Sequence, residues 1–115
     1  MRKSLSKLVL LGALTSFSFG GYISATNIKA ILVEKNKWVL VNIEDQSNTC
    51  HHWGYNLKLD ITTEQGKAMF KLLTIAKITD TTVGIGYTNS PTPGTDHNSG
   101  CSKDNMSEIY AVSSN

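Results

Sequence analysis

The stretch YNLKLDITTEQGKAMFKLLTIAKITDTTVGIGY, residues 55–87, changes its hydrophobic period and so decides the fold class. Apolar and polar residues alternate over 55–61, which predicts a half-buried strand. Thr62 and Gln65 then have capping-box spacing, which predicts the start of a helix. The apolar side chains that follow recur at helical intervals and predict an amphipathic helix of about four turns: Ala68, Met69, Leu72, Leu73, Ile75 and Ala76.

The end of this stretch returns to a strand. Asp80 stands where a helix commonly ends in glycine. Residues 83–87, Val-Gly-Ile-Gly-Tyr, then predict a short strand. Its two glycines, Gly84 and Gly86, permit either a close approach of neighbouring chain or a sharp bend of the strand.

The flanking segments add three more strands. Residues 22–33 alternate loosely and are rich in β-branched side chains, so we expect one long strand there. The polar turn 34–37 joins it to a second strand at 38–43, which predicts a hairpin. A long loop at 89–100 holds both prolines, and the last strand is expected at 108–112.

The resulting order is three strands, one helix and two strands. That order matches the OB-fold, a five-stranded Greek-key barrel with its helix between the third and fourth strands. We therefore expect a mainly β domain with one helix and the OB arrangement β-β-β-α-β-β, while other small β-rich folds stay open.

The N-terminal segment has the features of a secretory signal peptide over residues 1–20. Basic residues precede an apolar run at 8–14, and this run is too short to span a membrane. Small residues fit a cut after Gly20, which leaves residues 21–115 as the mature OB-fold domain; a cut after Ala25 fits less well. The alternative is an amphipathic N-terminal helix. We expect a secreted protein, with the periplasm as an intermediate or alternative location.

Removal of the leader changes the charge balance. The whole chain has 11 basic and 9 acidic residues. Three of the basic residues belong to the leader, so the mature chain has eight basic and nine acidic residues, a net charge of −1. Such a surface does not suit a nucleic-acid backbone, and its many Thr, Ser and Asn residues favour neutral or polar ligands.

Export also bears on the two cysteines. In an oxidising compartment Cys50 and Cys101 are expected to form a disulfide. A metal site with His51, His52 and His97 or a reactive thiol are the alternatives. However, the histidine spacing matches no common zinc motif, and no metal or cofactor is expected.

Catalytic motifs are not found. The chain contains no G-x-S-x-G and no H-E-x-x-H sequence. Glu44 and Asp45 are adjacent carboxylates, but glycosidase carboxylates are placed by the fold rather than by adjacency. The Gly84-x-Gly86 pair lacks the third glycine of a dinucleotide site. An enzyme is not expected.

A resemblance to a known family adds to this interpretation. Residues 69–77 and 83–87 resemble the helix and following strand of the B subunits of AB5 toxins of the subtilase cytotoxin and typhoid toxin type, and residues 22–25 resemble their first strand. The resemblance implies an OB-fold that forms a homopentamer, binds host cell-surface glycans, sialylated ones among them, and partners a toxin A subunit.

The same resemblance implies three ligand-binding residues. The glycan-contacting serine of the family's first strand matches Ser24, and its tyrosine after the helix matches Tyr87. Glu44 matches an acidic contact near the second strand. We expect Ser24 and Tyr87 to lie close together on one face of the barrel. The alternatives are a periplasmic or secreted OB-fold binding or inhibitor protein without a toxin partner, and a small secreted enzyme.

Overall fold

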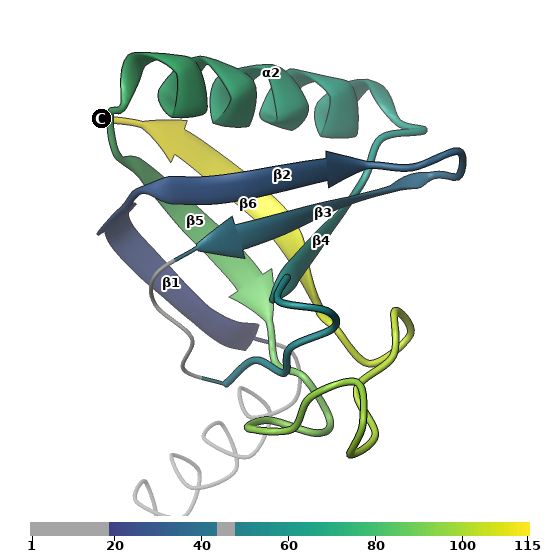
Figure 1. Ribbon diagram of the computed structural model, residues 1–115. Helices are drawn as coiled ribbons and strands as arrows, with labels where there is room; N and C mark the ends of the chain where they lie inside the picture. Colours follow the sequence, from purple (N-terminus) through teal and green to yellow (C-terminus); the bar gives the residue numbers. More distant parts are fainter. Residues whose placement is uncertain (1–18, 44–47) are drawn as a thin grey trace, which may run out of the picture.

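The computed structural model describes residues 19–43 and 48–115 and shows a mainly β chain (Figure 1). In this described part there is one helix, and the element order is β1 (Phe19–Thr26), β2 (Ile28–Val33), β3 (Trp38–Ile43), β4 (Leu57–Asp60), α2 (Glu64–Thr79), β5 (Val83–Thr88) and β6 (Ser107–Ser114). The predicted mainly β chain with one helix is therefore confirmed for these residues.

The strands form one sheet in the order β1-β5-β6-β4-β3-β2. Four neighbouring pairs are antiparallel, and the pair β4–β6 is parallel. The two outer strands, β1 and β2, are not paired with each other, so within the described residues the sheet is not closed into a barrel. The expected five-stranded barrel is corrected to an open sheet of six described strands.

The additional strand arises because the predicted strand 22–33 is divided at Asn27. Thr26 pairs with Val83 of β5, whereas Ile28 pairs with Ile43 of β3. The chain thus exchanges one hydrogen-bonding partner strand for another within two residues. A continuous β-rich sequence does not reveal such an exchange, because each half alone has ordinary strand character.

The helix ends are defined by side-chain and backbone hydrogen bonds. The N-cap is Thr63, one residue after the Thr62 of the predicted capping box, and its Oγ1 accepts a hydrogen bond from the Gly66 N–H at 2.9 Å. At the other end Asp80 adopts the left-handed conformation with φ 55°, and its N–H donates to the Ala76 carbonyl. Asp80 therefore takes the role that glycine commonly has.

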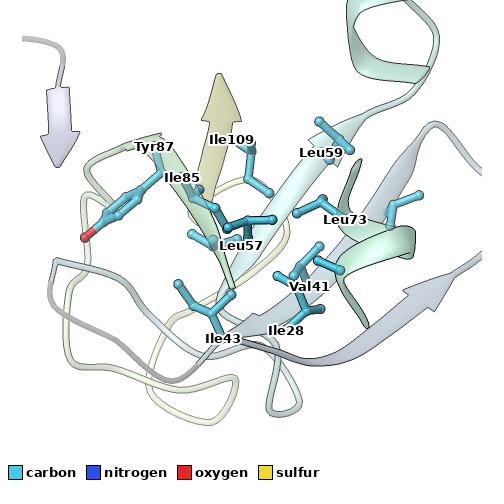
Figure 2. Close-up of a cluster of buried hydrophobic side chains, with 12 residues drawn as sticks. Ile28, Val41, Ile43, Leu57, Leu59, Leu73, Ile85, Tyr87 and Ile109 are labelled. Atoms are coloured by element: carbon cyan, nitrogen blue, oxygen red, sulfur yellow. The ribbon is translucent and has the colours of Figure 1, made fainter. Parts of the chain in front are cut away.

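The main hydrophobic core lies between the sheet and α2, which covers one end of the sheet (Figures 1 and 2). Leu73 is the large helix side chain that is fully buried there. The helix also supplies Ala76, and strands β2 to β6 supply the rest of the buried cluster: Ile28, Val39, Val41, Ile43, Leu57, Leu59, Val83, Ile85, Tyr87 and Ile109.

A second, smaller cluster surrounds the disulfide on the other side of β3. Cys50 and Cys101 are bonded, with an S–S distance of 2.01 Å and their Cα atoms 5.8 Å apart, so the predicted pairing is confirmed. Both are buried, and Leu40 and Met106 pack with them. Cysteines that are joined in this way are not thiolate metal ligands. Among the residues described, no group of three or more His, Cys, Asp or Glu is placed to hold a metal ion.

Two observations bear on cellular location. A buried disulfide fits a protein of an oxidising compartment. Over 19–43 and 48–115, no helix has both the length and the apolar character needed to cross a membrane. Most of the predicted signal peptide, residues 1–18, lies outside the described residues, and secretion stays a prediction.

Candidate functional site

The side chains of β5 alternate between the core and the opposite surface of the sheet. Val83, Ile85 and Tyr87 are buried in the main core. Gly84 and Gly86 therefore face outward, between β1 on one side and β6 on the other. A strand with two outward glycines leaves a strip of bare backbone in the middle of this surface.

Two exposed tyrosines cover that strip. A Cβ atom at Gly84 would overlap the Tyr22 hydroxyl and the Ser113 hydroxyl, and one at Gly86 would lie 2.9 Å from the ring of Tyr110. Tyr22 is nevertheless 59% exposed and Tyr110 45% exposed. The glycines thus allow both rings to lie close to the sheet while much of each ring remains open to solvent. The groups that approach Gly84 and Gly86 closely are side chains.

Ser24 lies on β1 two residues after Tyr22, and both side chains are exposed. The backbone at Ser24 is held from the C-terminal side of the chain: Asn115 Nδ2 donates to the Ser24 carbonyl at 3.0 Å and to Thr82 Oγ1 at 3.1 Å. These bonds fix the strand but do not use the Ser24 hydroxyl. We call Tyr22, Ser24, Tyr110 and Ser113 the tyrosine face.

Tyr87 does not share this surface. It is only 2% exposed, and its hydroxyl lies 3.2 Å from the place where a Cβ of Gly21 would be. Figure 2 shows its ring at the margin of the aliphatic cluster, with the hydroxyl directed away from the aliphatic side chains. The expectation that Ser24 and Tyr87 lie on one face therefore differs from the structure, because Tyr87 belongs to the inward series of β5. Glu44, the third predicted residue, lies outside the described residues.

Sequence reasoning missed the two tyrosines that are exposed. Tyr22 is opposite Gly86 in the β1–β5 pairing. Tyr110 lies at a register shift, since Gly86 pairs with Ala111 while Tyr87 pairs with Ile109. The alternation Tyr-x-Ser in β1 and Gly-x-Gly in β5 was the signal available for Tyr22, but no local signal marks the bulge that places Tyr110.

The tyrosine face combines ring surfaces with neutral hydroxyl groups. Tyrosine and serine hydroxyls both donate and accept hydrogen bonds, and an aromatic ring offers a flat apolar surface beside its polar tip. This is chemistry suited to a sugar, whose ring has apolar C–H edges and many hydroxyls. None of the four side chains that form the face is an acid, a base or a sulfur nucleophile.

Neither a protein-family model nor a curated protein nor a solved structure matches the chain. The candidate site is accordingly defined by the geometry of the tyrosine face.

Proposed function

We propose that the mature chain is a secreted glycan-binding protein of the AB5-toxin B-subunit type, and that it recognises host cell-surface glycans through the tyrosine face. The observation that carries the proposal is the pair of exposed tyrosines above Gly84 and Gly86, with the Ser24 hydroxyl on the same strand as Tyr22. Exposed aromatic rings beside the exposed Ser24 side chain suit weak, repeated sugar contacts.

The proposal includes an OB-type fold in which β1 and β2 together act as one bent first strand. Three features support it. Only Asn27 separates β1 from β2, β4 and β6 are parallel neighbours, and α2 lies between β4 and β5 in the chain. Counted in this way, the elements follow the OB order.

The proposal also includes a homopentamer, with an A subunit as a further partner. The surface of α2 supports self-association, because Ile75 and Ile78 are exposed, Ile78 by 76%. These two large aliphatic side chains would be buried if copies of the chain packed together through α2. Five copies would present five tyrosine faces and raise the avidity for a cell surface.

The test is a glycan array probed with residues 21–115. Ser24→Ala removes one hydroxyl, and Tyr22→Ala removes one ring; binding of the recognised glycans is expected to fall about tenfold or more in each. Ser114→Ala removes an exposed hydroxyl of β6 outside the tyrosine face, so it is the matched control and should bind as the parent protein does.

The outcomes separate the functions considered. Sugar binding that survives Ser24→Ala and Tyr22→Ala unchanged would remove the tyrosine face from the proposal. A parent protein that binds no glycan and remains monomeric would instead favour the periplasmic or secreted binding or inhibitor protein without a toxin partner.

A further inference from the structure

A polar pocket lies between the segment around Cys50 and the loop 94–99. In Figure 1 both of these chain segments lie at the end of the sheet away from α2. The volume of the pocket is about 360 Å³, which is at the small end of ligand pockets. Six residues line it: Thr49, His51, Gly94, Thr95, Asp96 and Ser99. None of them belongs to the tyrosine face.

The pocket is built from two segments that are distant in sequence. The Gly94 N–H donates to the Thr49 carbonyl at 2.9 Å, and the His51 N–H donates to the Thr95 carbonyl at 2.8 Å. Between Thr49 and His51 stands Cys50, whose disulfide to Cys101 joins the same two segments. The walls are therefore tied by covalent and hydrogen bonds before any ligand arrives.

Asp96 gives the pocket one charged acceptor. Its Oδ1 accepts hydrogen bonds from the N–H groups of Asn98 and Ser99 and from the Ser99 hydroxyl. The Ser99 hydroxyl is the main cause that lowers the pKa of Asp96, followed by the Asn98 N–H. All three bonds go to Oδ1, which leaves Oδ2 as an acceptor for a ligand hydroxyl.

An exposed tryptophan, Trp53, follows the pocket residue His51 by two positions. His52 and Tyr55 exchange backbone hydrogen bonds around a two-residue turn, Trp53-Gly54, and both turn residues have positive φ, 54° and 89°. Such a turn favours Asn, Asp or Gly, so a bulky tryptophan is an unusual occupant. Residues held in such conformations often mark functional sites.

The Trp53 ring stacks on His97, the neighbour of the pocket residue Asp96. The ring centroids are 3.7 Å apart, and the planes make an angle of 20°. Trp53 is nevertheless 67% exposed, so the ring face turned away from His97 is open to solvent. The stack holds the indole as a flat apolar platform on His97, the residue that follows the pocket residue Asp96 in the chain.

We propose that this pocket and Trp53 form a second saccharide site that takes a neutral sugar ring. The indole packs on the apolar face of the sugar, and Asp96 Oδ2 with the threonine and serine hydroxyls accepts and donates hydrogen bonds to its hydroxyls. The negative charge of Asp96 disfavours sugars that carry a carboxylate. The site is independent of the tyrosine face, whose failure would leave it intact.

The experiment uses Trp53 as its own reporter. The chain has two tryptophans, so Trp38→Phe leaves Trp53 as the only indole that emits. The probes are methyl galactoside, methyl glucoside and N-acetylglucosamine as neutral sugars and the methyl glycoside of N-acetylneuraminic acid as the acidic one. A saturable change in Trp53 emission is expected with at least one neutral sugar and none with the acidic sugar.

Two variants test the residues. Asp96→Asn keeps a side-chain oxygen for the loop and is expected to weaken the bound neutral sugar about tenfold. In a Tyr22→Ala background, which disables the tyrosine face, Trp53→Asn suits the turn and is expected to abolish the remaining heat of neutral-sugar binding in calorimetry while the melting temperature is kept or raised. Tyr22→Ala, in the Trp38→Phe background, should leave the Trp53 titration unchanged.

Three results would overturn the proposal. One is the lack of any Trp53 response to the neutral sugars. The second is tighter binding of the acidic sugar than of all neutral ones. The third is unaltered calorimetric binding by a folded Tyr22→Ala/Trp53→Asn protein relative to Tyr22→Ala alone.

Discussion

The phenolic hydroxyl of Tyr22 lies 3.1 Å from the hydroxyl of Ser113, 91 residues later in the chain. These residues belong to β1 and β6, and β5 runs between the two strands. The hydrogen bond crosses β5 at Gly84, where a side chain would occupy the same space. One glycine therefore allows two distant segments to build a common surface.

This relationship predicts the behaviour of Gly84→Ala. The added methyl group meets the exposed ends of the Tyr22 and Ser113 side chains, which can rotate away, so we expect a small change in melting temperature. Glycan binding should fall at least as far as in Ser24→Ala, because the Tyr22 ring moves. In a Tyr22→Phe/Ser113→Ala background both obstructing hydroxyls are gone, and Gly84→Ala should then have a smaller effect. Equal losses in both backgrounds would contradict this explanation.

Gly66→Ala is predicted to lower the stability of the protein, although replacing a helical glycine by alanine usually raises it. Alanine normally stabilises a helix relative to glycine by about 1 kcal/mol. Here a Cβ would overlap the backbone carbonyl oxygen of Asp60, which has no flexible side chain to move away. We expect unfolding free energy to fall by about 1–3 kcal/mol in urea titration. Ala68→Gly, at an exposed helix position, is the control and should cost about 0.5–1 kcal/mol.

Loss of the disulfide is predicted to lower stability substantially. Cys50→Ala/Cys101→Ala should reduce the unfolding free energy by about 2–5 kcal/mol, because the bond closes a long loop in the unfolded chain. Reductant should produce a similar loss in the parent protein and none in the variant. Two free thiols found by non-reducing mass analysis of exported protein would contradict the pairing.

The stability of the folded segment around Asp96 is predicted to fall at acid pH. Hydrogen bonds lower its pKa from the ordinary value of 3.8, the largest cause being the Ser99 hydroxyl. The folded segment thus favours the ionised form, so this contribution is complete above pH 3.8 and is lost as the pH falls through the lower folded value. Amide-proton NMR of Asn98 and Ser99 should report the loss. Asp96→Asn should show no such transition.

Self-association is predicted to depend on the exposed surface of α2. Light scattering on residues 21–115 should give a mass near five chains if the proposed pentamer forms. Ile75→Lys/Ile78→Lys should shift the protein to monomers, since charged side chains oppose burial between helices. Val33→Lys alters an apolar residue on β2 that is about as exposed as Ile75 and is the control. A parent protein that stays monomeric at high concentration would contradict the pentamer.

Local patterns in the sequence determined much of the secondary structure and the disulfide. The helix follows from apolar spacing and capping residues, and Asp80 ends it. Period-two alternation located β4 within a few residues, and the strands predicted at 38–43 and 83–87 match β3 and β5 to within one residue. With two cysteines in the chain, the disulfide had one possible intramolecular pairing. All of these depend on short-range chemistry or on simple counting, which a sequence carries by itself.

Tertiary structure alone decided which side chains meet. The exchange of partner strands at Asn27 and the register shift before Tyr87 depend on long-range hydrogen bonds. These bonds place Tyr110 outside. Similarly, the polar pocket exists because Thr49 and Gly94 lie together, 45 positions apart in the chain. Such contacts depend on the packing of the whole sheet. The conformational preferences of a short segment do not specify which distant segment it will contact.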